Sequence, residues 1–305
     1  MPDPSSSPAP AWPALSYADF APTQHLLHMM LQVVGKLKLA DPFHAEWAEV
    51  PLWITATGLG TGPIPCETGA YEIRLDLIAH RLDWVTSQGA QGGFDLGPGS
   101  VADFAETLLG QLRGAGVEAR IDMMPQEVPN PVPFDQDKEA RPYRADLVTA
   151  WWRVMLRCHR VLYAFQGRFT GKTQPIGLMW GTLDIRLALY NGKPATPGKS
   201  DGFIRSNAMN AELMEMGWWS GDPSYQKPAF YAFTYPQPKG IEQEQIGPDG
   251  AGWSTDMGEF VLDYDKLRQA DDPDAALMRF LTTSYQAGAS TAGWSADLLG
   301  GGKPI

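Results

Sequence analysis

The feature that most constrains the fold is an order of segments that occurs twice along the 305-residue chain. Each half has an amphipathic helical pattern, then Gly-Lys, then an aromatic strand pattern with the motif W-x-T. A Gly/Pro loop, further strand patterns and an N-capped helix follow in both. The matching residues are Gly35, Lys36, Trp53 and Thr55 in the first half and Gly171, Lys172, Trp180 and Thr182 in the second. This order predicts an internal duplication.

Two similar α+β halves are therefore expected, each with a mostly antiparallel sheet and helices packed outside. A proline-rich stretch over residues 125–142 is the natural boundary between them. The expected organisation is a disordered Pro/Ser tail over 1–15, a first half over 16–124, the connector 125–142, a second half over 143–298 and a frayed tail over 299–305. A cleft where the two sheets meet is the expected ligand site.

Local patterns place the main elements. Apolar residues recur every three or four positions over 145–166, which predicts a helix, and alternate over 71–77, which predicts a strand. Ser100 and Asp272 precede helical patterns and are expected to cap them. A strand is expected over 117–124 and a short helix over 207–216.

The Gly-Lys-Thr at residues 171–173 does not predict a phosphate-binding loop. Gly167 and Gly171 are separated by three residues, one fewer than the phosphate loop requires. The order of predicted elements is helix, loop and strand, the reverse of a phosphate loop. We expect each Gly-Lys to end a helix instead, with glycine as the left-handed cap.

Composition excludes several classes of function. The net charge is −11 and Lys and Arg do not cluster, which disfavours nucleic acid and membrane surfaces as partners. The two cysteines, Cys66 and Cys158, form no CxxC pair, so neither a disulfide framework nor a zinc cluster is expected. The first residues lack the pattern of a signal peptide, so we expect a cytoplasmic, soluble protein. The oligomeric state is not predicted.

One polar stripe on the first helix holds candidate reactive groups. His28, Gln32 and Lys36 are spaced at four residues, so they would point a base, an amide and a cation in one direction. The alternative is a solvated helix face. His25 lies three residues before His28, but no nearby carboxylate completes a ligand set, so no metal is expected.

A second candidate set lies on the strand over 178–189. Asp184 alternates with Trp180 and Arg186 on the side opposite the apolar residues, where it could act as a general base or anchor a ligand. The alternative is a surface Asp–Arg pair on an exposed sheet face. On the matching strand of the first half, Trp53 and Thr55 take the equivalent side.

Further candidates are weaker. Asp76 and His80 are four residues apart and could form an acid/base pair, or His80 could simply be exposed at a hairpin end. Glu212, Tyr231 and Glu259 are possible ligand contacts, although both glutamates could equally be surface charges.

The motifs "HMMLQVVGKLKL", "VPLWITATGLGTGPIP", "PIGLMWGTLDI" and "DPDAALMRFLTTSYQA" together resemble a bacterial domain of unknown function, number 5996. The resemblance implies no reaction, fold or cofactor. It adds weight to the candidate residues above, which stand at matching positions. Members of the family carry His where this chain has Gly177 and Ala211, which implies a divergent member.

These observations lead to an expected function. We expect a small-molecule enzyme with acid/base chemistry and no cofactor, its cleft lined by Trp53, Thr55, Trp180 and Asp184 with His28 and Lys36 nearby. A non-catalytic binding protein with an aromatic-lined pocket is the alternative. A scaffold protein with an exposed aromatic patch is a third possibility.

Overall fold

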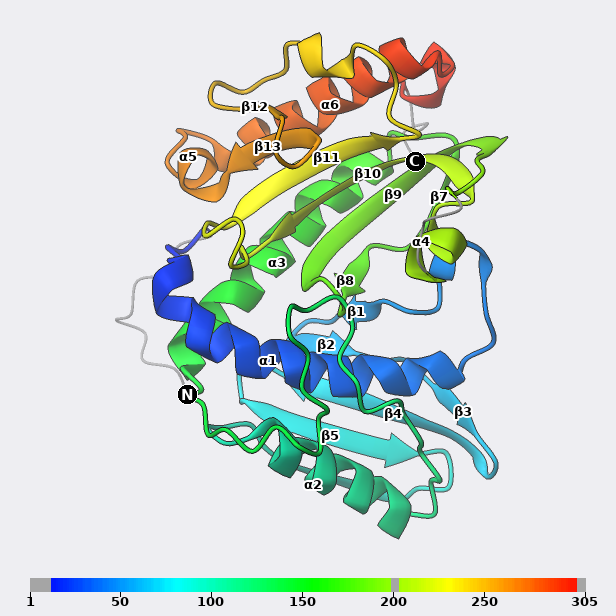
Figure 1. Ribbon diagram of the computed structural model, residues 1–305, viewed down its shortest axis with the longest axis vertical. Helices are drawn as coiled ribbons and strands as arrows, with labels where there is room; N and C mark the ends of the chain where they lie inside the picture. Colours follow the sequence, from blue (N-terminus) through cyan, green and yellow to red (C-terminus); the bar gives the residue numbers. More distant parts are fainter. Residues whose placement is uncertain (1–11, 199–202, 301–305) are drawn as a thin grey trace.

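The computed structural model describes residues 12–198 and 203–300 and contains one large antiparallel sheet (Figure 1). The strand order is β12-β13-β11-β10-β9-β8-β1-β2-β4-β5-β6. The first-half strands are β1 (Leu52–Ile54), β2 (Gly58–Gly60), β3 (Ile64–Cys66), β4 (Gly69–Asp76), β5 (Arg81–Thr86) and β6 (Gln91–Asp95). The second-half strands are β7 (Lys172–Thr173), β8 (Gly177–Met179), β9 (Asp184–Pro194), β10 (Ala211–Trp219), β11 (Ala229–Tyr235), β12 (Gly252–Ser254) and β13 (Glu259–Asp263).

The longer helices are α1 (Tyr17–Leu37), α2 (Val101–Gly114), α3 (Ala145–Gln166) and α6 (Pro273–Ala292). Two short ones are α4 (Phe203–Ala208) and α5 (Tyr264–Arg268), and 3-10 turns cover Lys38–Ala40, Ala45–Trp47, Ile241–Gln243 and Ala296–Leu298. In Figure 1, α3 and α6 lie behind β9, β10 and β11, and α2 lies along β5.

One face of the sheet is apolar across both halves. Directly paired residues on neighbouring strands point to the same face, so the register traces each face. One row runs Leu262, Phe230, Trp218, Ile185, Leu178 and Leu52, and a second runs Ile54, Leu59, Leu75, Leu82 and Phe94. These residues contribute to one continuous hydrophobic core with the helices.

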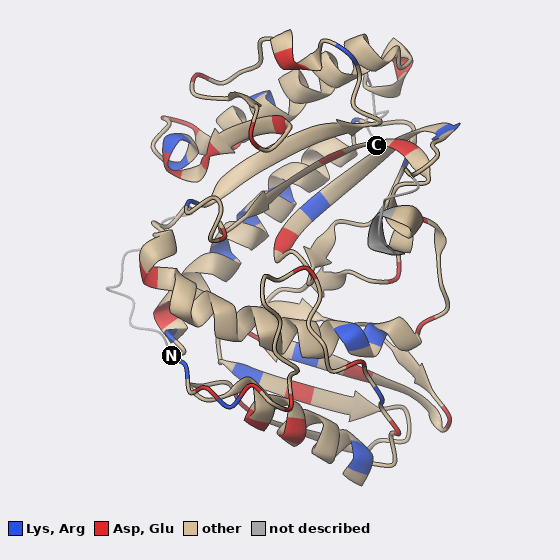
Figure 2. Cartoon of the chain, viewed as in Figure 1, with Lys and Arg blue, Asp and Glu red and all other residues tan. Residues whose placement is uncertain are grey.

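The opposite face carries polar residues. Its row runs Arg186, Gly177, Trp53, Gly60, Arg74 and Asp83. In Figure 2 both signs of charge occur on the first-half strands and on β9. This polar face therefore offers charged groups in both halves of the sheet.

Several predictions from the sequence are confirmed. The helix expected over 145–166 is α3. Ser100 and Asp272 cap α2 and α6, because their side chains accept hydrogen bonds from Asp103 N and Ala275 N at 3.1 and 3.0 Å. The mixed helix and strand class with antiparallel pairing is also confirmed.

Other expectations are corrected. Two separate sheets are wrong, because β1 hydrogen-bonds to β8 and joins the halves into one sheet. No strand forms over 117–124, which belongs to an irregular connector. The short helix expected around Glu212 is wrong, since residues 211–219 form β10. This strand is paired on both sides and largely buried on both faces, so its sequence lacks clear alternation.

Gly35 does not end a helix. It lies inside α1, and a Cβ there would come within 2.2 Å of the Trp180 ring. Gly171 lies beyond the end of α3, in the bend before β7. Gly35 is thus needed for the close approach of Trp180 to the helix, and the two Gly-Lys pairs are not structurally equivalent.

The expected tails fall partly outside the described residues, which begin at residue 12 and end at residue 300. Within the description, Trp12 and Leu15 are buried, and Trp12 Nε1 donates to Asp274 Oδ1 at 2.9 Å. Residues 12–15 are therefore packed rather than disordered. Among the described helices, none has the length and apolar content needed to cross a membrane.

Candidate functional site

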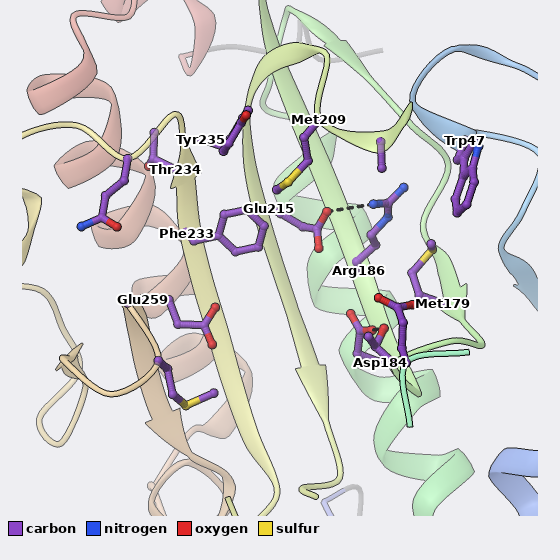
Figure 3. Close-up of a pocket in the computed structure, with 16 residues that line it drawn as sticks. Trp47, Met179, Asp184, Arg186, Met209, Glu215, Phe233, Thr234, Tyr235 and Glu259 are labelled. Atoms are coloured by element: carbon purple, nitrogen blue, oxygen red, sulfur yellow. Dashed lines mark hydrogen bonds and ion pairs between the residues drawn. The ribbon is translucent and has the colours of Figure 1, made fainter. Parts of the chain in front are cut away.

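Two adjoining cavities lie on the polar face of the second-half strands, with volumes of about 520 and 530 Å³. Both are bounded by the same acidic and neighbouring residues: Glu127, Thr182, Asp184, Glu215, Met257 and Glu259. We call the first the Arg186 lobe, which also contacts Arg186, Trp47, Phe233 and Tyr235, and the second the His28 lobe, which also contacts His28, Gln24, Trp219 and Tyr231. Figure 3 shows the Arg186 lobe.

Asp184, the first residue of β9, is held by two hydroxyl groups. Thr182 donates a hydrogen bond to one carboxyl oxygen and Tyr231 donates to the other. The side chain is 7% exposed. Burial raises the pKa of Asp184, while the two hydroxyl donors act to lower it. The carboxyl group is thus oriented and remains at the cavity wall.

A buried ion pair stands beside it. Arg186 Nη1 lies 2.8 Å from Glu215 Oε2 on β10, the contact drawn in Figure 3, and Arg186 Nη2 donates to Gln174 Oε1 at 2.6 Å. Gln174 in turn donates to Glu46 O at 2.7 Å. Burial raises the pKa of Glu215, and the nearby Arg186 charge opposes that shift. Arg186 is thereby fixed between two strands and a loop.

Two more carboxyl groups enter from opposite sides. Glu259 is the first residue of β13, and Glu127 comes from the connector with a positive φ of 56°. Burial, together with the charges of Glu215 and Asp184, raises the pKa of Glu259 to about 8. Burial also raises the pKa of Glu127, and the charges of Asp184 and Glu215 act in the same direction. Glu259 can therefore exchange a proton near neutral pH, which an exposed carboxyl group does not.

Aromatic rings cover the cavity floor next to the acids. On β10 and β11, Trp219 packs edge-on to Tyr231 at 5.8 Å between centroids, and Tyr231 is stacked on Phe233 at 6.3 Å. Burial raises the pKa of Tyr231 well above 10, so its hydroxyl group keeps its proton. The site combines acidic groups with flat apolar surfaces.

The polar stripe on α1 is brought to the site only in part. His28 lines the His28 lobe, and its Nε2 lies 3.0 Å from the carbonyl oxygens of Trp180 and Gly181. Burial lowers the pKa of His28 to about 4, so the ring is neutral at pH 7. Gln32 is fully buried and clamps the connector, donating to Gln126 O at 2.7 Å and accepting from Gln126 N at 2.8 Å.

Lys36 lies outside both lobes. It is buried, its Nζ is 3.7 Å from Asp122 Oδ2, and burial lowers its pKa. The solvated helix face considered for this stripe is wrong for Gln32 and Lys36, because the connector covers them.

Of the two W-x-T motifs, Thr182 lines both lobes, whereas the two tryptophans and Thr55 do not. Trp180 is buried against α1 and its Nε1 donates to Val50 O at 3.0 Å. Trp53 lies under Lys38 Nζ at 5.1 Å, and Thr55 Oγ1 accepts from Gly58 N at 3.0 Å. Neither Trp53 nor Thr55 contacts the two lobes.

Asp76 and His80 lie within electrostatic reach of each other in the first half, but each is hydrogen-bonded to other partners. Asp76 Oδ1 accepts from Ile78 N and Ala79 N at 2.9 and 2.7 Å, while His80 Nδ1 lies 3.0 Å from Tyr143 Oη. Glu212 accepts from Asn191 Nδ2 at 2.5 Å near the far end of β10. None of these three residues contacts the lobes, whereas Tyr231 and Glu259 do.

Sequence reasoning missed Glu215 and Glu127. Glu215 faces the site because residues 211–219 form a strand, and a correct strand assignment would have placed it beside Arg186. Glu127 reaches the site through a connector without regular structure, and no local pattern signals this.

Gly177 and Ala211, where the resemblance implies His, lie on β8 and β10. Gly177 pairs with Arg186, but a Cβ there would come within 2.7 Å of Pro51 Cβ. Ala211 is the first residue of β10. Across residues 12–198 and 203–300, no group of three or more His, Cys, Asp or Glu side chains is arranged to hold a metal ion.

This architecture defines an α+β protein in which one antiparallel sheet bears a half-buried, carboxyl-rich cavity on its polar face. A family of unknown function, DUF5996, matches residues 12–300, so the chain belongs to that family. No curated protein and no solved structure matches the chain.

Proposed function

We propose that the protein is a small-molecule enzyme that carries out general acid/base chemistry in the two lobes, without a redox cofactor. The observation that carries this proposal is the contrast between Asp184 and Glu259 at one cavity. Asp184 accepts two hydroxyl hydrogen bonds, whereas the Glu259 carboxyl has no hydrogen bond within the described residues. Pairs of titratable groups in contrasting environments divide acid and base roles between them.

The roles follow from those environments. Asp184 is the base, because its hydroxyl partners stabilise the ionised form and fix the direction of its oxygens. Glu259 is the acid, because its pKa of about 8 keeps it protonated at neutral pH. Arg186 compensates Glu215 and keeps that carboxylate oriented beside the reacting groups.

The test compares proteins in a metabolite extract followed by mass spectrometry. We expect the wild-type protein to consume a compound that Asp184→Asn leaves intact, with a rate loss of about 100-fold or more. Glu259→Gln should slow the same reaction. Asp83→Asn, on the same sheet face in the first half, is the matched control and should retain the wild-type rate.

A non-catalytic binding protein is the second candidate. It is supported by the aromatic floor of Trp219, Tyr231 and Phe233, which suits stacking of a flat ligand. Native mass spectrometry of the purified protein separates the two. A stoichiometric ligand that co-purifies, in a protein that changes no compound in the extract, would contradict the enzyme proposal and favour this one.

We also propose that the two halves of the fold arose by internal duplication. Support comes from the strand order outward from the β1–β8 pair, which is β1-β2-β4-β5-β6 on one side and β8-β9-β10-β11-β13 on the other, where the short strand β12 adds one more strand at the edge. A long helix precedes and another follows each set. Superposition of residues 17–114 on 145–292 in an experimental structure tests this, and non-coincident helices would contradict it.

A further inference from the structure

The balance of charge in the lobes indicates what kind of ligand they take. Asp184, Glu215, Glu259 and Glu127 border both lobes, and Arg186 is the cationic side chain within the described lining. That guanidinium already contacts Glu215 and Gln174. Its charge also acts on Asp184, so Glu259 and Glu127 are the carboxyl groups that lack a compensating positive charge from the described part of the protein.

A second observation in the His28 lobe points the same way. Gln24 Nε2 donates to Gly221 O at 2.7 Å, so the Gln24 Oε1 atom points away from this carbonyl group. This Oε1 atom is buried and has no hydrogen-bond donor within residues 12–198 and 203–300. A buried acceptor without a donor is costly, and a rotation of the Gln24 amide toward the His28 lobe, which Gln24 lines, lets a ligand N–H or O–H group satisfy it.

The walls favour an organic cation. Trp219 and Tyr231 form one wall of the His28 lobe, and Phe233 and Trp47 border the Arg186 lobe. Aromatic faces attract ammonium groups through their quadrupole and also pack against apolar carbon. Side chains arranged to hold a bare metal ion are absent from the described residues.

We propose that the lobes take a protonated organic amine, whose ammonium group lies among Asp184, Glu215 and Glu259 and whose apolar body lies along Trp219 and Tyr231. This inference rests on the proposed function, since it names the substrate class of the same site. The ammonium N–H groups would donate to the carboxylates and to Gln24 Oε1, and the positive charge would complete the balance around Arg186.

Binding is expected to be linked to proton release. The titratable and charged groups that line the lobes with Glu259 are Asp184, Arg186, Glu215, Glu127, Asp222, His25, His28, Tyr17, Tyr231 and Tyr235. Burial and the charges of Glu215 and Asp184 hold the pKa of Glu259 at about 8 in the free protein. A cation placed beside Glu259 lowers that pKa toward neutral, so amine binding at pH 7 releases part of this proton and tightens as pH rises toward 8, while the Glu259 that stays protonated remains the acid.

The experiment uses three probes with one body: phenethylamine, 2-phenylethanol and 3-phenylpropionate. Isothermal titration calorimetry of the full chain should show that phenethylamine binds at least about tenfold more tightly than the neutral alcohol. The anion should bind worst. Titrations in buffers of different ionisation enthalpy should show proton release with the amine alone.

The variants separate the site from general acidity. Glu259→Gln should weaken phenethylamine binding about tenfold and abolish proton release. Glu72→Gln, on the open face of the first half, should change neither. Near-ultraviolet circular dichroism checks that both variants are folded, and the wild-type proton release stands independently if Glu259→Gln is not.

The outcomes distinguish this inference from the proposed function. Equal binding of the alcohol, tighter binding of the anion, no saturable amine binding at millimolar concentration, or no effect of Glu259→Gln overturns it. Turnover of a neutral or anionic metabolite would leave the enzyme proposal intact while overturning the amine. Amine binding with proton release but without any turnover would support the amine and overturn the enzyme.

Discussion

The polar face of the sheet carries an Arg–Glu pair in each half, and the two pairs differ in burial. In the first half, Arg74 and Glu72 are 69% and 27% exposed, whereas in the second half Arg186 and Glu215 are 7% and 14% exposed. Both involve charged side chains at the same kind of sheet position. The difference comes from what covers them, because α1, the connector and the loop around Trp47 border the cavities in which Arg186 and Glu215 lie, whereas Arg74 is open to solvent.

This difference shows that strand alternation places charges but covering segments decide what they can do. An exposed pair is solvated and contributes little, while a buried pair depends on each partner for compensation. The carboxyl groups over β9–β11 and β13 acquire raised pKa values because they are covered. Four measurements test whether burial makes the charged groups of the two halves behave differently.

The largest effect is expected from removing the buried cation. Arg186→Met leaves Glu215 and Asp184 without compensation and should lower the free energy of unfolding by about 3–5 kcal/mol at pH 7. The matched change, Arg74→Met, should cost less than about 1 kcal/mol. Urea unfolding measures both. Similar losses in the two variants would show that burial does not distinguish the pairs.

The next effect concerns two helical glycines: Gly35 in α1, which contacts Trp180 of the second half, and Gly110 in α2 of the first half. Gly35→Ala pushes a methyl group into the Trp180 ring and should destabilise by about 1–3 kcal/mol. Gly110→Ala in α2 meets no atom within 4 Å and should stabilise by about 0.5–1 kcal/mol. Thermal melts measure the pair of changes. A stabilised Gly35→Ala would mean that Trp180 does not press on α1.

A third measurement uses the pH dependence of stability, where the two halves should differ in sign. The pKa of Glu259 is raised to about 8 on folding, so the unfolded state releases this proton first. Its contribution is complete below pH 4.5 and is lost as pH rises to about 8. Glu259→Gln should remove this loss, which grows by about 1.4 kcal/mol for each pH unit above 4.5 and reaches about 2 kcal/mol by pH 6, with urea unfolding from pH 4 to 9 as the measurement.

Asp76 provides the opposite sign in the first half. Burial acts to raise its pKa, but the N–H groups of Ala79 and Ile78 outweigh burial, so the pKa is lowered. Its contribution is present above the unfolded pKa and is lost as pH falls. Asp76→Asn should therefore lower the free energy of unfolding at neutral pH but not in acid. If the stability effects of Asp76→Asn and Glu259→Gln changed with pH in the same direction, the comparison would be contradicted.

The smallest effect is the titration of the His28 ring, which takes place well below pH 7 and so does not change the free energy of unfolding at that pH. Burial lowers the pKa of His28 to about 4, so its ring stays neutral through the physiological range. Nuclear magnetic resonance of the ring protons should give a midpoint near pH 4. A midpoint near 6.5 would mean that water reaches His28 freely in the His28 lobe.

The sequence predicted the helix and strand class, the caps at Ser100 and Asp272, and the side of β9 on which Asp184 and Arg186 lie. These follow from local periodicity and capping chemistry, which act over a few residues. The pairing of β1 with β8 joins residues more than a hundred positions apart, and no local pattern encodes it.

The site was predictable only where alternation was visible. Asp184, Tyr231, Glu259 and His28 were named and line the lobes. Trp53 and Trp180 were named for their aromatic rings, but packing against Lys38 and α1 occupies them. Glu127 was not foreseeable, because the connector places it through its hydrogen bonds to Gln32.

The clamp between Gln32 and the connector also bears on how the chain is made. Residues that border the His28 lobe range from Tyr17 to Glu259, so they leave the ribosome far apart in time. An emerging first half can dock the connector on α1 early, but β10, β11 and β13 must arrive before any lobe exists. Nascent chains shorter than about 260 residues therefore hold an unfinished site, even though α2 and α3 can already pack against α1.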